Sequence, residues 1–199
     1  MFMRRASLFL MSMMAISQAQ AANLRAADVI TFDVAGVKTG MDYDEAVKAM
    51  TEHFHVPASS LDVDKYPALN VVTGDKQPQY IAYEKNGVKL LVHFEGRVPA
   101  DPKHALAVSQ ISYELPYSTE NKNAMAKAAV EKYGVQSNAP YTPMVWCKAP
   151  GKMATMACGP DPEQPVLKLS GTSLEMNDPS WTNARIKLMD SKQTRTPGF

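Results

Sequence analysis

The sequence lacks the common motifs of catalysis and nucleotide binding. It contains no G-x-S-x-G, no H-E-x-x-H, no C-x-x-C, no phosphate-binding P-loop and no G-x-G-x-x-G. We therefore predict no catalytic residue and no cofactor. Because a catalytic triad is assembled in space rather than in sequence, an unrecognised hydrolase stays an alternative.

The N-terminus lacks an apolar run long enough to span a bilayer. A basic start, MFMRR, is followed by the short apolar run ASLFLMSMMAI and then by Ala19-Gln20-Ala21, a small-x-small cleavage pattern. This order is typical of a secretory leader, so we predict that residues 1–21 form a signal peptide. Since no cysteine follows the cleavage pattern, no lipid anchor is implied, and we expect a periplasmic or secreted bacterial protein.

The sequence also lacks an excess of charge of either sign. Lys and Arg number 21, and Asp and Glu number 20. Removal of the leader takes away Arg4 and Arg5 and lowers the formal net charge from +1 to −1. A near-neutral protein has no electrostatic attraction for nucleic acid or an anionic membrane, so we expect neither as a partner.

Two segments show helical patterns. Asp42 followed by Glu45 is a variant capping box, and the spacing of the apolar residues predicts a helix from there to His55. A second helix is predicted to begin near Ser118 and to end at Gly134, because glycine commonly follows the last turn of a helix.

The remaining periodic segments have the alternation of strands. The clearest is the hairpin 79–96, where Asn86-Gly87 favours a tight turn. Further strands are predicted over 29–36, 104–115, 143–148, 165–171 and 184–190. Helices combined with antiparallel strands predict an α+β fold.

The two predicted helices resemble copies of one another. Residues 47–56 (VKAMTEHFHV) align with residues 126–135 (AKAAVEKYGV), and strands follow each helix. We interpret this as two tandem modules, 22–115 and 116–199, each a helix packed on an antiparallel sheet. Chance similarity between two alanine-rich helices is the alternative. The positions predicted to be buried are Met50, Phe54, Ala129 and Tyr133.

The stretch GVKTGMDYDEAVKAM, residues 36–50, resembles the start of small bacterial envelope modules such as the SmpA/OmlA-type assembly lipoproteins. Tandem helix-plus-sheet modules also resemble the β-lactamase inhibitor protein family. The resemblance implies an α+β fold and a role in binding or scaffolding. Two features depart from it: the lipoprotein cysteine is absent, and the second helix lacks the leading Gly-Met pair.

Cysteine is scarce: Cys147 and Cys158 are the only two in the chain. Export into an oxidising compartment favours a disulfide between them. A regular hairpin turning at Pro150-Gly151 would separate them by roughly 13 Å at the rise of a strand. A disulfide needs Cα atoms within about 7 Å. We therefore predict an irregular loop that the disulfide closes at its neck.

This loop is the predicted contact surface for another envelope or secreted protein, in a role such as an inhibitor or an assembly accessory. The predicted partner-binding residues are Trp146, Lys148, Lys152, Met153 and Met156. A disulfide that serves only as a structural staple is one alternative.

Copper handling is a second alternative, because thioethers and thiolates suit Cu(I). The candidate ligands are Met144, Met153, Met156 and the two cysteines. His93 and Glu95, two residues apart on a strand, form a weaker metal candidate. Since methionine is also an ordinary core residue and a disulfide would remove both thiolates, we assign no metal ligand.

Overall fold

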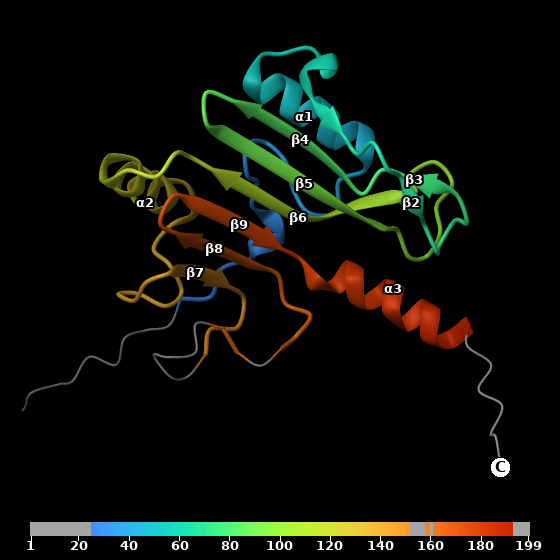
Figure 1. Cartoon of the computed structure of the whole chain (residues 1–199). Coiled ribbons are helices and arrows are strands. Elements are labelled where there is room, and N and C mark those ends of the chain that lie inside the picture. The colour runs from blue at the N-terminus through green and yellow to red at the C-terminus, as the bar shows by residue number, and fades with distance from the viewer. Residues whose placement is uncertain (1–24, 152–157, 160, 193–199) are drawn as a thin grey trace, which may run out of the picture.

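The computed structural model describes residues 25–151, 158–159 and 161–192 and shows an α+β fold (Figure 1). The predicted signal peptide, 1–21, lies outside the described residues. The helices are α1 (Tyr43–Phe54), α2 (Thr119–Tyr133) and α3 (Pro179–Lys192), with two short 3-10 turns, Val29–Thr31 and Ala58–Ser60. The strands are β1 (Asp62–Val63), β2 (Ala68–Leu69), β3 (Lys76–Gln77), β4 (Tyr80–Lys85), β5 (Val88–Gly96), β6 (Leu106–Glu114), β7 (Met144–Cys147), β8 (Val166–Ser170) and β9 (Ser173–Asn177).

Seven of these strands form one antiparallel sheet in the order β1-β4-β5-β6-β9-β8-β7, and β2 pairs with β3 in a separate ribbon. One face of the large sheet carries an apolar row of residues that lie opposite one another on successive strands. Each of these side chains has an exposed fraction of 0%: Ile81, Val92, Ile111, Met176, Leu167 and Trp146. The core lies between this face and the helices α1 and α2, which contribute Met50, Met125 and Ala129 to it.

The capping box predicted for α1 is confirmed. The Asp42 carboxylate accepts the Glu45 backbone N–H at 2.8 Å, and the Glu45 carboxylate accepts the Asp42 N–H at 2.9 Å. At the other end, His55 adopts a left-handed conformation with φ of 53° and closes the helix. Met50 is fully buried, whereas Phe54 is half-buried and stacks on Tyr83 with ring centroids 3.9 Å apart.

The boundaries predicted for α2 are also confirmed. Ser118 accepts the Asn121 backbone N–H at 2.9 Å, and Gly134 follows the last turn with φ of 81°. Ala129 is buried as predicted. Tyr133 is half-buried and packs edge-on against the Trp146 ring.

The hairpin β4–β5 turns at Asn86-Gly87, where both residues have positive φ, as predicted. The strands predicted over 29–36 and 184–190 are wrong. The first region forms the 3-10 turn and an isolated bridge between Val34 and Val37. The second region lies inside α3, whose first helical residue is Pro179. The Asp178 carboxylate, just before the helix, accepts the Ser180 N–H and so caps the helix.

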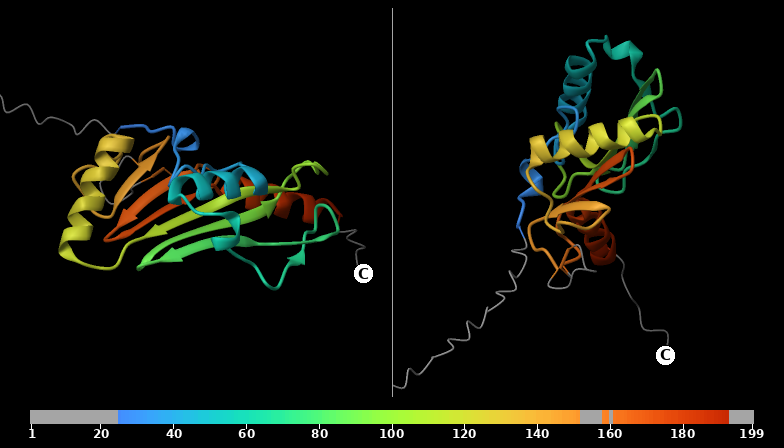
Figure 2. Two further views of the ribbon diagram at one scale, coloured as in Figure 1. Left: turned by 90° about the horizontal axis from the view of Figure 1, so that it is seen from above. Right: turned by 90° about the vertical axis from the view of Figure 1, so that its left-hand side faces the viewer.

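The interpretation as two tandem modules is not confirmed as a division of the chain. In each half a helix precedes strands of the large sheet: α1 precedes β1, β4, β5 and β6, with the β2–β3 ribbon inserted between β1 and β4, and α2 precedes β7, β8 and β9. However, β6 pairs with β9, so both sets of strands belong to one sheet, and buried residues from both halves form one core cluster. Figure 2 shows α1 across one side of this sheet and α3 on the opposite side.

Candidate functional site

The face of the sheet opposite to α1 and α2 is open to solvent over its central strands. We call it the open face and define it by two rows of side chains that lie opposite one another on successive strands. The rows are Ala82, Leu91, Ser112, Glu175 and Lys168, and Tyr80, His93, Gln110, Asn177 and Val166. All ten side chains are half-buried or exposed. Strand alternation produces this contrast, because neighbouring residues on a strand point to opposite faces.

Polar contacts hold the centre of the open face in place. The Gln110 amide donates to the Glu175 carboxylate at 2.6 Å, across the pairing between β6 and β9. The Tyr80 and His93 rings are neighbours, with centroids 6.1 Å apart. Partial burial lowers the pKa of His93, which favours a neutral imidazole at neutral pH. The open face therefore combines the Tyr80–His93 aromatic pair, apolar side chains such as Leu91, and the hydrogen-bonded polar side chains of Gln110 and Glu175.

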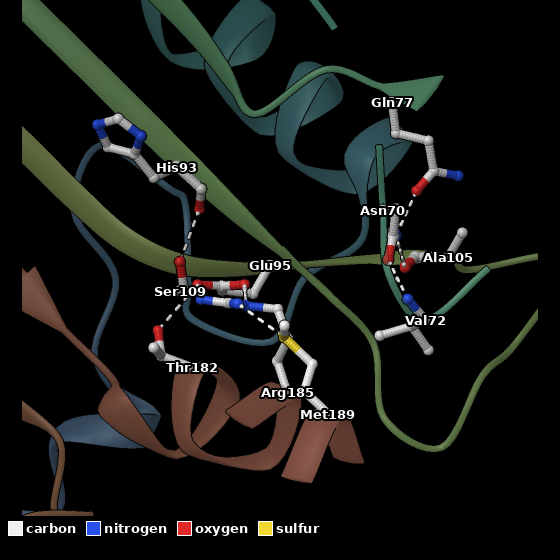
Figure 3. A network of polar contacts seen from close by, with 10 residues as sticks. All are labelled: Asn70, Val72, Gln77, His93, Glu95, Ala105, Ser109, Thr182, Arg185 and Met189. Atoms are coloured by element: carbon white, nitrogen blue, oxygen red, sulfur yellow. Dashed lines mark hydrogen bonds and ion pairs between the residues drawn. The ribbon is translucent and has the colours of Figure 1, made fainter. Parts of the chain in front are cut away.

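One end of the open face is bounded by α3 (Figure 3). The Glu95 carboxylate, on β5, accepts the Arg185 Nε–H at 2.7 Å and the Thr182 hydroxyl at 3.0 Å. Beside this ion pair lies a polar cavity of about 230 Å³, which Asn70 and Gln77 of the small ribbon also line. The Asn70 amide donates to the Gln77 side chain at 2.5 Å, and the Val72 N–H donates to Asn70. The Glu95 contacts join α3 to the sheet, and the Asn70 amide also lies 3.5 Å from the Ala105 carbonyl, just before β6.

The disulfide lies at the β7 edge of the open face. Cys147 lies opposite Val166 at the edge of the sheet, so the second row of the open face continues directly to it. Cys147 and Cys158 are bonded, with their Cα atoms 6.1 Å apart, which confirms the predicted pair. A bridge between Pro150 and Cys158 forms the neck of the loop.

Gln164 fixes this neck and was not identified from the sequence. Its side chain is 6% exposed and accepts the Ala149 N–H at 3.0 Å while donating to the Gly159 carbonyl at 3.1 Å. The Gly159 N–H in turn donates to the Ala149 carbonyl at 2.6 Å. Both ends of the loop are thus held by hydrogen bonds as well as by the disulfide.

The predicted partner-binding residues fall into three groups. Lys148 is exposed at the neck of the loop. Lys152, Met153 and Met156 lie outside the described residues. Trp146 has an exposed fraction of 0%, and its indole N–H donates to the Gly134 carbonyl at 3.0 Å. We therefore correct its role to that of a core residue, because a side chain with no accessible surface offers nothing for a partner to contact.

The candidate metal ligands that the structure describes do not gather at one place. Within the described part of the chain, no three His, Cys, Asp or Glu side chains gather as a metal site would require. The candidate ligand Glu95 is bound to Arg185, and both cysteine sulfurs are in the disulfide. None of the helices within the described ranges is long and apolar enough to cross a membrane.

His104 and Asp42 form the one acid–imidazole contact among the described side-chain hydrogen bonds. Burial raises the pKa of the Asp42 carboxyl, but hydrogen bonds from the Glu45 backbone and from His104 outweigh it, so the pKa is below its usual value. The cavity beside this pair has a volume of about 450 Å³. None of the residues that line it is a serine, threonine or cysteine, so the pair has no adjacent nucleophile of these types among them.

No protein-family model matches the chain, and neither a curated protein nor a solved structure matches it. The resemblance to the SmpA/OmlA-type modules and to the β-lactamase inhibitor protein family is therefore unsupported by these comparisons and stays a prediction.

Proposed function

We propose that this chain is an exported protein-binding module and that its contact surface is the open face together with the disulfide-closed loop beside it. The observation that carries the proposal is the contrast between the two faces of one sheet. The row from Ile81 to Trp146 is completely buried under helices, whereas the rows through Leu91 and His93 are accessible. A sheet that α1 and α2 cover on one side leaves the other side available for a partner.

The chemistry of the open face suits a protein surface. Lys168 lies opposite Glu175, and Lys89 forms an ion pair with Glu84 at 3.4 Å, so charges of both signs alternate. Such a face has no net attraction for a polyanion. The aromatic pair Tyr80–His93 and the apolar Leu91 lie beside the polar Gln110 and Ser112, and protein–protein interfaces commonly combine aromatic, apolar and hydrogen-bonding groups in this way.

The neck of the disulfide-closed loop adds a second part to this surface. It is held by the disulfide and Gln164, so little conformational entropy is lost there when a partner docks. Lys148 provides an exposed cation at the neck. We retain Lys152, Met153 and Met156 as proposed partner contacts. The partner is another envelope or secreted protein, and the chain acts on it as an inhibitor or as an accessory of assembly.

Site-specific photocrosslinking tests which face binds. A benzoylphenylalanine residue replaces Ser112, at the centre of the open face, and in a matched variant replaces Lys127, which is exposed on α2. We expect an adduct with an envelope protein from position 112 and none from position 127. The substitution Leu91→Glu should abolish the adduct without lowering the melting temperature, because Leu91 lies outside the buried core. Adducts of equal yield from both positions, or from position 127 alone, would overturn the proposal.

A further inference from the structure

An apolar groove lies on the helical side of the molecule, away from the open face. Its volume is about 350 Å³, within the range of small-molecule sites. The floor is formed by Tyr113, Leu169 and Leu174 of the sheet, and one wall by Met125, Ala128 and Ala129 of α2. Val34 and Ala35, which precede α1, close the groove from the other side.

Small residues on α2 create the groove. Ala128 is exposed and Ala129 is 4% exposed, so this stretch of the helix brings only methyl groups toward the sheet. Met125 is the longer aliphatic side chain that α2 contributes to the lining, and the half-buried Tyr133 ring ends the same wall. A helix with Leu at these positions would fill the space, because cores normally pack without voids of this size.

Polar groups gather at one end of this apolar surface. Lys132 and His53 line the groove there, and the Lys132 ammonium donates to the Asp33 carboxylate at 2.6 Å. Burial raises the pKa of Asp33, but hydrogen bonds from Lys132 and the Gly36 N–H outweigh it, so the carboxyl has a pKa below its usual value and stays ionised. Burial lowers the pKa of His53 and the nearby Lys132 charge lowers it further, which favours a neutral imidazole.

Lysines outnumber carboxylates near this mouth. Lys132 pairs with Asp33, and the charge of Lys38 also lowers the pKa of Asp33, so a second cation lies within electrostatic range of the same carboxylate. The nearest glutamates on the two helices, Glu52 and Glu131, are exposed and are paired with Lys48 and Lys127 at 3.9 and 3.8 Å. An anionic group at the mouth would therefore meet a net positive charge, while a chain lying deeper would meet only apolar side chains.

We propose that this groove binds a small amphiphile, with its apolar chain over Leu169 and Leu174 and a single anionic group beside Lys132. The site is independent of the protein-binding surface, which lies on the other face of the sheet. A carboxylate with an alkyl chain is the simplest ligand of this chemistry.

Calorimetric titration of the purified full chain with octanoate and with octan-1-ol tests separately whether the groove binds an alkyl chain and whether it favours an anionic group. We expect both to bind, because the alkyl chain is shared. Ala128→Trp should lower the affinity for both by about tenfold or more by filling the groove. Asn123→Trp is the matched control, since Asn123 is exposed on α2 but does not line the groove.

The charge part is tested by Lys132→Gln against Lys127→Gln, since each removes one lysine of α2 that is in an ion pair. Lys132→Gln should weaken octanoate by about threefold, the size of one exposed ion pair, and leave octan-1-ol unchanged. Lys127→Gln should change neither. Failure of both ligands to bind, or equal binding by the Ala128→Trp variant, would overturn the groove as a site. An equal effect of Lys132→Gln on both ligands would overturn the anionic group.

Discussion

Trp146 connects three parts of the molecule through one side chain. Its indole N–H binds the carbonyl of Gly134 at the end of α2, its ring packs against Tyr133, and its position in β7 places it opposite Leu167. The residue that looked most suited to an interface is therefore the anchor that holds α2 on the edge of the sheet. Aromatic residues are common both at protein interfaces and in cores. For Trp146, only the pairing of β7 with β8 shows that the residue belongs to the core.

We predict that Trp146→Ala lowers the free energy of unfolding by about 3–5 kcal/mol, because it removes a fully buried ring and leaves the Gly134 carbonyl without this donor. Urea denaturation followed by circular dichroism measures the change. Tyr141→Ala is the control, since Tyr141 is 48% exposed and its loss should change stability by no more than about 0.5 kcal/mol. Equal effects of the two substitutions would contradict the assignment of Trp146 to the core.

At the scale of elements, α3 differs from the other two helices. No side chain in it is buried, and Ile186 is 45% exposed. It is attached by the polar contacts of Glu95 with Thr182 and Arg185 and by the half-buried Trp181 ring, which lies beneath the Arg97 guanidinium at 5.2 Å. A helix held in this way should open locally before the sheet does, because buried apolar contacts contribute most of the protection against unfolding.

The substitution Glu95→Gln should speed amide hydrogen exchange in α3 and leave the exchange of β5 and β8 unchanged. Glu163→Gln is a matched control, since Glu163 also pairs with α3, through Lys187 at 2.5 Å. The Glu163 side chain is 45% exposed and the Glu95 side chain only 18% exposed. We expect a loss of local stability of about 1–3 kcal/mol for Glu95→Gln and less than about 1 kcal/mol for the control. Faster exchange throughout the sheet would contradict a local role.

The elements that could be predicted from the sequence are those that local chemistry specifies. The capping box at Asp42, the glycine after α2 and the turn at Asn86-Gly87 each act within a few residues. The error over 184–190 arose because alternating apolar residues on a half-exposed helix imitate a strand. The signal that could have prevented it, Asp178 followed by Pro179, lies outside that segment.

The candidate site was less predictable, because it depends on pairing between distant strands. The open face exists only once β6 lies beside β9, and Gln164 reaches the neck of the loop from well beyond it. No local pattern specifies which of two alternating faces the helices will cover. The disulfide was predictable because the chain has no other cysteine to pair.

At the scale of the whole molecule, the sheet makes the two halves of the chain dependent on one another. Five register pairs join β6 to β9, and residues from both halves share the core. We therefore predict a single unfolding transition, with a calorimetric enthalpy equal to the van't Hoff enthalpy. Tandem modules that fold independently would give two transitions.

A substitution in one half tests this coupling directly. Ile81→Ala removes a fully buried side chain from β4 and should cost about 2–5 kcal/mol. We expect the same fall in the denaturation midpoint whether unfolding is followed by Trp146 fluorescence, in a Trp181→Phe background that removes the other tryptophan, or by hydrogen exchange of β5. An unchanged midpoint at Trp146 would show that the two halves unfold separately.

The pairing of β6 with β9 also sets an order in time during synthesis. Gln110 of β6 and its partner Glu175 of β9 are 65 residues apart in the chain. At the usual speed of translation, about 5–20 residues per second, β6 emerges several seconds before the strand that will cover its edge. An uncovered edge can pair with a strand of another chain. The growing protein is thus exposed to aggregation through this edge during the interval, and the risk is removed only once β9 itself has been made.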